Sequence, residues 1–353
     1  MEQASQRIVL LTDGHSDPLV AKTAVCVIRY RPQDVVAVFD RGAVGQTSQA
    51  LLGVGGETPV IGDLNAAEGA NTLMIGIAPP GGKVPDAWRP ILVEALARGM
   101  NVVSGLHQFL SDDPELAAAA QQHGATIQDV RKNSEREVAS GKGFRDDAFR
   151  VLTIGQDCSI GKMVAAVEMT RELKRRDIDA KFVATGQTGI MIEGDGCPID
   201  CVVSDFVNGA VEKLILDRQQ HEVLIIEGQA TIAHPRYSCV SAGLLHGSRP
   251  HAMVMVYEPG RTQVHGMPHV PLASVARTIE AYENLAALMH PSKVVALAMN
   301  SRKLSADEAA EERKRMRGEL GLPVADPIRD GAGELIDAIL AYREKIVPAA
   351  AMA

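Results

Sequence analysis

Short runs of β-branched and aliphatic residues alternate along the chain with longer segments whose apolar positions recur at helical spacing. This alternation is typical of a parallel α/β sheet, in which a helix connects each strand to the next. In the first part of the chain the pattern predicts helices over Trp88–Arg98 and Pro114–His123. It predicts strands over Val35–Asp40, Thr72–Ile77, Asn101–Ser104 and Thr126–Asp129.

A second series of the same kind follows a polar segment. Arg131–Arg150 is charged and almost free of large aliphatic residues, so we interpret it as a domain boundary. Beyond it the pattern predicts strands over Phe149–Ile154, Ala180–Ala184, Val223–Glu227, Ala252–Tyr257 and Val294–Asn300, and helices over Lys162–Arg176, Leu272–Leu288 and Ser305–Leu320. A chain of 353 residues exceeds one ordinary domain. We therefore expect an α/β protein with a Rossmann-like domain over 1–135, a linker over 136–148 and a P-loop NTPase-like domain over 149–353.

The most informative motif begins where the first strand of the second series ends. Phe149–Ile154 runs directly into the sequence GQDCSIGK, and a helical pattern follows at once. A strand, a glycine-rich turn, a lysine and a helix form the context of a phosphate-binding loop, whose backbone N–H groups and helix N-terminus face the anion. The residues expected to contact a ligand's phosphates are Gly155, Asp157, Cys158, Ser159, Ile160, Gly161, Lys162 and Met163.

Two departures from the usual motif change its interpretation. Five residues separate Gly155 from Gly161, a spacing that resembles the loop of dethiobiotin-synthetase-like proteins. Met163 stands where a P-loop NTPase uses Ser or Thr to bind Mg²⁺, and a soft thioether is a poor ligand for that hard ion. The loop is thus predicted to hold a cofactor's phosphates without Mg–ATP hydrolysis. Cys158 lies near a helix N-terminus and could be a nucleophile, but simple packing or ligand contact is favoured.

Acidic and basic groups outside the loop are further candidates. Glu227 ends the apolar strand VLIIE and should face the loop across the edge of the sheet. Asp195 lies in the glycine-rich segment TGQTGIMIEGDGCPID, which we expect to be a mobile loop near the ligand. After Glu227 comes a group of histidines and arginines that includes His234. Its arginine forks match carboxylates, so Arg236, Arg249 and Arg261 are candidates for binding a dicarboxylate.

Composition and charge exclude several classes of protein. The net charge of -8 and the pI near 5.7 argue against a general nucleic-acid binder. No stretch approaches the roughly 18 apolar residues of a membrane span. The five scattered cysteines fit reduced thiols in a cytoplasm, and no spacing matches a recognised zinc site. We expect a cytoplasmic homo-oligomer that acts on a small molecule and binds no metal.

Several motifs, in order across nearly the whole chain, resemble one family. They are GIAPPGGKVPDAW, GMNVVSGLHQFLSDDPEL, IGQDCSIGKM, TGQTGI, DFVNGAVEKLI, IIEGQATIAHP and YEPGR. The resemblance is to the DgcN-type D-glutamate N-acetyltransferases, formerly a family of unknown function with a P-loop-like C-terminal half. It implies transfer of the acetyl group of acetyl-CoA to D-glutamate, or a related acidic amino acid, in D-amino-acid catabolism. It also implies a pathway partner, an enolase-superfamily racemase that acts on the N-acetyl product.

Acetyl transfer to an amine requires a base and a site for the donor's phosphates. The candidates for the base are Glu227, Asp195 and His234, with Glu227 slightly ahead, and these roles do not come from the resemblance. Two other interpretations stay open. An ATP-dependent ligase or small-molecule kinase of the dethiobiotin-synthetase type could use Asn300 to read a base, although Met163 counts against it. A non-enzymatic nucleotide or CoA sensor could use the first domain as its output module.

Overall fold

The computed structural model describes residues 6–79 and 81–346 of the chain, and its contacts divide the chain into two compact units. The first unit comprises Met1–Asn133 together with Ile190–Cys201, and the second comprises Ser134–Gly189 with Val202–Ala353. The chain therefore returns to the first unit for one short segment after it has entered the second. The hydrophobic pattern contains no signal for this return.

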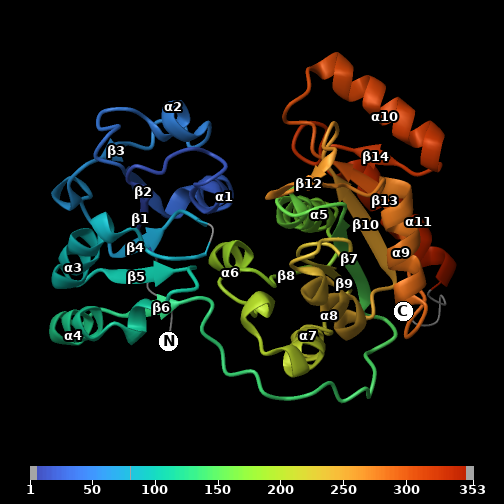
Figure 1. Cartoon of the computed structure of the whole chain (residues 1–353), viewed down its shortest axis with the longest axis horizontal. Coiled ribbons are helices and arrows are strands. Elements are labelled where there is room, and N and C mark those ends of the chain that lie inside the picture. The colour runs from blue at the N-terminus through green and yellow to red at the C-terminus, as the bar shows by residue number, and fades with distance from the viewer. Residues whose placement is uncertain (1–5, 80, 347–353) are drawn as a thin grey trace. The chain divides into compact units, whose positions relative to one another are not determined.

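The first unit is built on a six-stranded parallel sheet with the strand order β3-β2-β1-β4-β5-β6 (Figure 1). Because helical connections cover such a sheet, its strands are apolar on both faces. The strands are β1 (Ile8–Leu11), β2 (Val35–Phe39), β3 (Val60–Ile61), β4 (Thr72–Ile75), β5 (Asn101–Ser104) and β6 (Ile127–Asp129). The helices are α1 (Lys22–Tyr30), α2 (Ser48–Leu52), α3 (Arg89–Ala97) and α4 (Pro114–His123), and α6 (Gln187–Glu193) runs across the boundary between the units.

The second unit contains another six-stranded parallel sheet, in the order β14-β13-β10-β7-β9-β8. Its strands are β7 (Phe149–Gly155), β8 (Ala180–Val183), β9 (Val223–Ile226), β10 (Ala252–Tyr257), β13 (Lys293–Met299) and β14 (Val324–Ala325). Its helices are α5 (Lys162–Arg175), α7 (Val207–Leu216), α8 (Ser238–Ser248), α9 (Val275–Ala286), α10 (Ala306–Leu320) and α11 (Gly333–Ile346). Two parallel sheets with helical connections confirm the predicted α/β class.

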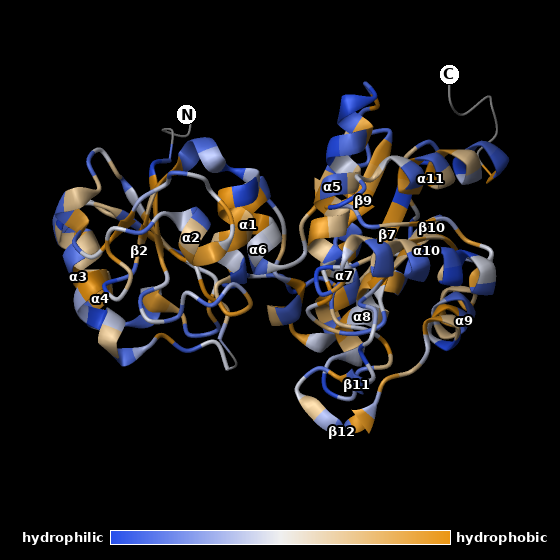
Figure 2. Cartoon of the chain, turned by 90° about the horizontal axis from the view of Figure 1, so that it is seen from above, coloured by the Kyte–Doolittle hydropathy of each residue, from blue (hydrophilic) through white to orange (hydrophobic). Residues whose placement is uncertain are grey.

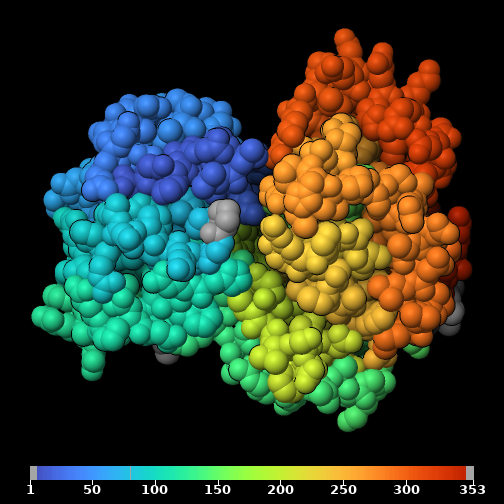
Figure 3. Space-filling view, viewed as in Figure 1, coloured from blue at the N-terminus to red at the C-terminus, as the bar shows by residue number. Residues whose placement is uncertain are grey.

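The sheet of the second unit lies between two layers of helices. Helices α5 and α11 contact each other on one side, whereas α8 contacts α7 and α9 on the other (Figure 2). A small antiparallel hairpin, β11 (Gln263–Val264) and β12 (Met267–Pro271), follows β10. Its strand β12 is largely exposed and lies, in orange, on the visible surface of the second unit in Figure 3. No helix among the described residues is long and apolar enough to cross a membrane.

Helix α8 was missed because its sequence, SCVSAGLLHGS, has little helical propensity. Its two glycines are explained by packing. A Cβ on Gly243 would lie 2.3 Å from Cγ1 of Val207, and one on Gly247 would lie 2.7 Å from Cβ of Val211. Helix α7 therefore approaches the backbone of α8 closely, and burial between the two helices outweighs propensity.

The expectation of a mobile loop over TGQTGIMIEGDGCPID was wrong for much of that segment. Residues Gln187–Glu193 form α6, and a 3-10 turn covers Ile199–Cys201. The glycines that suggested a loop are partly packing positions, because a Cβ on Gly189 would lie 2.4 Å from Oε2 of Glu227.

The polar segment between the two sheets contains no helix or strand, yet it is attached to the second unit. The buried carboxylate of Glu212 on α7 accepts hydrogen bonds from the backbone N–H groups of Ser140 and Gly141. Lys213 adds an ion pair of 3.0 Å with Glu135. A Cβ on Gly209 would lie 2.0 Å from the carbonyl oxygen of Glu137, so this glycine lets the segment lie directly on the helix.

Candidate functional site

The carboxyl ends of the strands in the second unit bring the candidate groups to one edge of its sheet. The glycine loop follows β7, the central position between β10 and β9. Glu227 follows β9, Glu258 follows β10 and Asn300 follows β13. In open parallel sheets ligands bind at this edge, so the topology places these side chains where a ligand would lie.

The glycine loop closes around its own lysine. Nζ of Lys162 donates a hydrogen bond of 2.7 Å to the carbonyl oxygen of Asp157. A Cβ on Gly155 would lie 2.9 Å from that Nζ, so a larger residue at the end of β7 would displace the lysine side chain. Ser159 and Gly161 have φ angles of 55° and 105°, which turn the backbone sharply before α5 begins.

Burial lowers the pKa of Lys162 to about 8, although the nearby Cys158, Asp157 and Glu227 pull it upward. The side chain is buried, so its ammonium has little access to water. Burial removes the water that stabilises the charged form of the ammonium, so an anionic partner stabilises that form most strongly.

Asp157 fixes the loop from within. Its carboxylate is fully buried, and Oδ1 accepts the N–H of Cys158 at 2.7 Å. Oδ2 accepts Nη1 of Arg261 at 2.9 Å and the N–H of His265 at 2.8 Å. Both oxygens are therefore engaged in holding the loop against the chain that follows β10.

Glu258 is the centre of a cluster of cations that the sequence pattern did not indicate. Its carboxylate accepts Nη2 of Arg261 at 2.8 Å, Nη2 of Arg302 at 3.0 Å and Nζ of Lys303 at 2.6 Å. Burial raises the pKa of Glu258, but the hydrogen bond from Lys303 and the charges of the three cations outweigh it and lower the pKa overall. Glu258 is in the YEPGR motif, and the cations follow strand ends, which is the signal that could have identified them.

Glu227 presents a buried, oriented carboxylate at the same edge. Its Oε2 accepts the N–H groups of Thr185 at 2.9 Å and Gly186 at 3.0 Å, just after β8. The hydroxyl of Thr185 also donates to the Glu227 carbonyl at 2.7 Å. Two backbone donors fix the direction of the carboxylate, and its charge acts on Lys162.

The turn after Glu227 is unusually tight. The N–H of Gly228 donates to Oγ1 of Thr153 at 2.9 Å. A Cβ on Gly228 would lie only 1.6 Å from the carbonyl oxygen of Thr153, so no other residue fits without moving β7. This glycine keeps Glu227 next to the strand that carries the loop.

His234 is buried close to Asp157, with Nε2 4.0 Å from Oδ1. Its Nδ1 accepts the N–H of Arg236 at 3.1 Å. We infer that the proton is on Nε2, which faces the carbonyl oxygen of His265 at 3.4 Å. The ring also stacks on Tyr237 at a centroid distance of 4.7 Å. The basic lone pair of a neutral His234 is thus already in use.

The three candidate arginines lie in different environments. Arg236 is exposed, on the loop that follows β9 and near the β11–β12 turn, where a Cβ on Gly266 would lie 3.6 Å from its Nη1. Arg261, in contrast, is 13% exposed and bridges Asp157 and Glu258. The expectation that Arg261 binds a substrate carboxylate conflicts with this pairing.

Arg249 does not lie with the loop. Its carbonyl oxygen accepts Nε of Arg150, the second residue of β7, at 3.0 Å. Arg249 therefore lies at the amino edge of the sheet, opposite the loop, where its guanidinium pairs with Glu212 at 3.2 Å. The expectation of a substrate contact is corrected to a structural one, because the side chain helps Glu212 hold the segment between the sheets.

Asp195 belongs to the first unit and is exposed. The second unit by itself therefore does not bring Asp195 to Glu227 and His234. Asn300, in contrast, contacts the glycine loop of the second unit, because its Nδ2 donates a hydrogen bond of 2.9 Å to the carbonyl oxygen of Ile160.

Two groups of side chains among the described residues have the spacing of metal ligands. In the second unit Asp157, Cys158 and His234 lie close together, but the Asp157 oxygens are already bonded. In the first unit the group consists of His107, Asp200 and Cys201. There Oδ2 of Asp200 accepts Nη2 of Arg131 at 2.9 Å, and burial and the Asp200 charge raise the pKa of the Cys201 thiol to about 11. In both groups the carboxylate already has partners within the protein.

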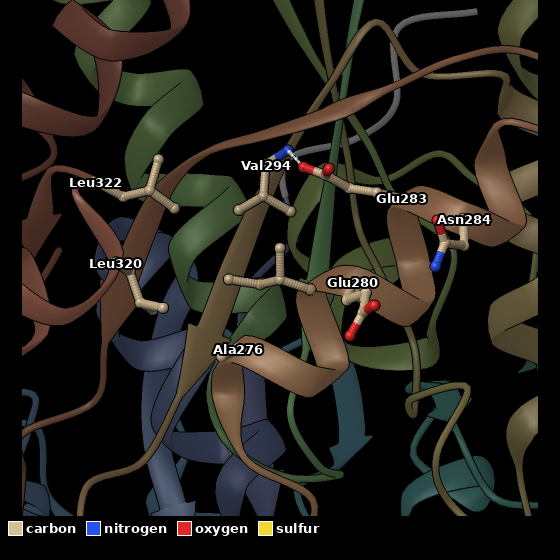
Figure 4. A pocket seen from close by; sticks show the side chains of 8 residues that line it. Ala276, Glu280, Glu283, Asn284, Val294, Leu320 and Leu322 are labelled. Atoms are coloured by element: carbon tan, nitrogen blue, oxygen red, sulfur yellow. Dashed lines mark hydrogen bonds between the residues drawn. The ribbon is translucent and has the colours of Figure 1, made fainter.

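A pocket of about 350 Å³ lies elsewhere in the second unit, between α9, the start of β13 and the end of α10 (Figure 4). Val294 in its wall donates its N–H to Glu283 at 3.0 Å (Figure 4). Val294 is the second residue of β13, so this pocket is at the amino edge of the sheet. It is not part of the site at the glycine loop.

Two family descriptions match the chain in order. Residues 41–133 match the domain of unknown function DUF1611_N, described as a Rossmann-like domain. Residues 137–336 match DUF1611_C, described as a P-loop domain. The predicted fold of each half is thereby confirmed.

Two relatives and a crystal structure are also similar over most of the chain. A D-glutamate N-acetyltransferase of Tritonibacter scottomollicae is 40% identical over 92% of this chain and 96% of its own. One from a Pseudoalteromonas species is 40% identical over 76% of this chain and 81% of its own. The crystal structure of a DUF1611 family protein from Anabaena variabilis ATCC 29413 has a TM-score of 0.89 and 37% identity, covering 95% of this chain and 99% of that one.

Proposed function

The chain belongs to the DUF1611 family, and from this premise we propose that it is a D-glutamate N-acetyltransferase that uses acetyl-CoA. The acceptor is D-glutamate or a closely related acidic amino acid. Support comes from the two relatives of that name, which are 40% identical to this chain. The racemase of the enolase superfamily that would use the N-acetyl product, and assembly into a homo-oligomer, are part of the same proposal.

The glycine loop is the observation that most favours this function. CoA carries a diphosphate, and the loop offers backbone N–H groups, the start of α5 and the buried ammonium of Lys162. Met163, the second residue of α5, stands where a Mg²⁺-binding hydroxyl would be needed for phosphoryl transfer. A loop with this composition suits a donor whose phosphates are held and never cleaved.

The proton-accepting role is assigned to Glu227. Acetyl transfer begins when the ammonium of the acceptor loses a proton, so that the nitrogen lone pair can attack the thioester carbonyl. The new C–N bond then forms, the C–S bond breaks, and the CoA thiolate leaves and takes up a proton. Glu227 is preferred to His234 because the single Nδ1 lone pair of His234 accepts the Arg236 N–H, whereas a carboxylate that accepts two N–H groups still has further lone pairs. Asp195, in the first unit, is kept as the alternative base.

Arg236 is the favoured partner for an acceptor carboxylate. Its side chain is exposed near the carboxyl edge of the sheet, and no residue within 6–79 and 81–346 forms a salt bridge with it. An exposed guanidinium that forms no salt bridge within the described residues can form two parallel hydrogen bonds to a substrate carboxylate.

The ATP-dependent alternative is weakened by Asn300. Its amide nitrogen donates to the Ile160 carbonyl at 2.9 Å, and its amide oxygen accepts the Arg302 N–H at 3.4 Å. The amide nitrogen and the amide oxygen, which would have to contact a nucleotide base, thus both form hydrogen bonds within the protein.

A thiol-release assay tests the function directly. Acetyl-CoA is supplied with D-glutamate, L-glutamate, D-aspartate and other single amino acids, and free CoA is detected with a thiol reagent. We expect release with an acidic D-amino acid. No release with any acidic amino acid would contradict the proposal, and ADP formation from ATP with the same acids would favour the ligase or kinase instead.

A further inference from the structure

The cluster around Glu258 offers a second anion site next to the glycine loop. Resting on the proposed use of acetyl-CoA, we propose that Arg302 and Lys303 bind the 3′-phosphate of the CoA adenosine. This phosphate distinguishes CoA from ordinary adenine nucleotides. The subsite would therefore determine which donor the enzyme accepts.

Charge balance favours an anion at the cluster. Arg261 is shared between Asp157 and Glu258, whereas Arg302 and Lys303 have Glu258 as their common partner. Within these direct ion pairs, two carboxylates face three cations. Glu258 is buried beneath the cations, and its fixed position keeps their charged groups together.

The cationic groups are accessible as well as fixed. The side chain of Lys303 is 62% exposed and that of Arg302 is 37% exposed, while Arg261 beneath them is 13% exposed. Arg302 and Lys303 thus reach solvent, and each of them binds only one oxygen of the Glu258 carboxylate. Lysine has three donors and arginine five, so donors remain for a phosphate.

The cluster is directly connected to the loop that would hold the diphosphate. Nη2 atoms of Arg261 and Arg302 share one oxygen of Glu258, while Nη1 of Arg261 reaches the Cys158 carbonyl in the loop at 2.8 Å. Asn300 ties the same segment to Ile160. In CoA one ribose separates the 3′-phosphate from the 5′-diphosphate, which matches two anion sites joined by one arginine.

The surface beside the cluster has room for the nucleoside. A hollow of about 390 Å³ begins at Pro259 and Gly260, just after Glu258, and continues to Leu304, just after Lys303. Its remaining wall includes Glu308, Glu311, Glu312 and Arg315. These glutamates repel phosphate, so the proposal places the 3′-phosphate at Arg302 and Lys303 and only the uncharged part of the nucleoside in the hollow.

Donor analogues provide the decisive experiment. The kcat/KM for acetyl-CoA is compared with that for acetyl-dephospho-CoA, which lacks only the 3′-phosphate. We expect the wild-type protein to prefer acetyl-CoA by tenfold or more, mainly through KM. In Arg302→Met and Lys303→Met the preference should fall toward one, with KM for acetyl-dephospho-CoA unchanged. Equal kcat/KM for the two donors in the wild type, or a variant that changes both donors alike, would overturn the subsite.

A matched control variant separates the loss of donor preference from the general effect of removing a surface charge. Lys293 is 63% exposed and pairs with Glu283 at 2.5 Å, much as Lys303 pairs with Glu258, but it starts β13 at the opposite edge of the sheet. Lys293→Met should keep the full donor preference. A loss of preference in Lys293→Met equal to that in Lys303→Met would refute the assignment.

Failure of the subsite and failure of the proposed function give different results. Turnover of both donors at equal kcat/KM rejects the subsite and leaves acetyl transfer intact. If neither donor is turned over, acetyl transfer is rejected, and calorimetry then decides the subsite. Adenosine 3′,5′-bisphosphate should bind at least tenfold more tightly than AMP, and equal binding would reject the subsite independently of catalysis.

Discussion

Replacing Lys162 with methionine tests two consequences of burying its ammonium. The side chain is buried, and its Nζ donates a hydrogen bond of 2.7 Å to the Asp157 carbonyl oxygen. Methionine has a similar length and volume but no charge. We expect Lys162→Met to be more stable than the wild type near pH 7 and to bind acetyl-CoA more weakly.

The stability effect follows from the lowered pKa. Burial moves the pKa of Lys162 from 10.5 to about 8, which corresponds to about 3 kcal/mol at 1.36 kcal/mol per pKa unit. The folded state disfavours the charged form, so this cost is fully present below about pH 8 and disappears as the pH rises through 10.5. The loss of the hydrogen bond to Asp157 offsets about 1 kcal/mol. Lys162→Met should thus gain about 2 kcal/mol at pH 7 and lose this advantage by about pH 10.

The binding effect has the opposite sign. A charge-assisted hydrogen bond to a phosphate contributes roughly 1.5–3 kcal/mol, so KM for acetyl-CoA should rise about 10- to 100-fold in Lys162→Met at pH 7. In the wild type only the charged lysine binds phosphate well. Its KM should therefore be constant below about pH 8 and increase above it, approaching the value of the variant.

Two measurements check these expectations. Denaturant unfolding between pH 6.5 and 10 gives the stability difference, and initial rates over the same range give KM. Lys174→Met is the control, because Lys174 is exposed on the same helix, and neither quantity should change. A wild-type KM that stays constant from pH 7 to 9.5, or a variant less stable than the wild type at every pH, would refute the reasoning.

Four further substitutions test the remaining roles. Glu227→Gln should lower kcat for acetyl transfer roughly 10²- to 10⁴-fold with little change in KM for acetyl-CoA, and rates near those of the wild type would exclude Glu227 as the base. Arg236→Met should raise KM for the amino acid, whereas Arg249→Met should lower the unfolding free energy and leave that KM unchanged, because Arg249 pairs with Glu212 at the other edge of the sheet. Gly228→Ala should destabilise the protein by more than about 3 kcal/mol in thermal or denaturant unfolding, since its Cβ would lie 1.6 Å from the Thr153 carbonyl oxygen, and a fully stable variant would show that β7 can move there.

Features that depend on residues adjacent along the chain could be predicted from the sequence. Strands β5 and β10 lie where the pattern predicts them, because buried strands of a parallel sheet are continuous apolar runs. Glu227 could be placed near the loop since both follow strands of one parallel sheet. The pattern failed for β1 and α8, where a strand of four residues and a helix of small residues carry little local signal.

The roles of charged side chains could not be predicted in the same way. Arg249 and Arg261 are close in sequence, yet one pairs with Glu212 at the amino edge and the other holds Asp157 in the loop. The periodicity of apolar residues contains no information on which carboxylate a long side chain will reach. Only the packing of β7 beside β10 brings Arg261 to the loop.

The sequence by itself determined the two α/β halves, the phosphate loop and the missing Mg²⁺-binding hydroxyl at Met163, because each is encoded by residues adjacent along the chain. Tertiary structure alone decided that Asp157 serves as an internal support, that Glu258 gathers three cations, and that Lys162 is buried with a pKa near 8. These properties depend on burial and on distances between residues far apart in the chain. Charge and desolvation act through space, and the order of residues does not record them.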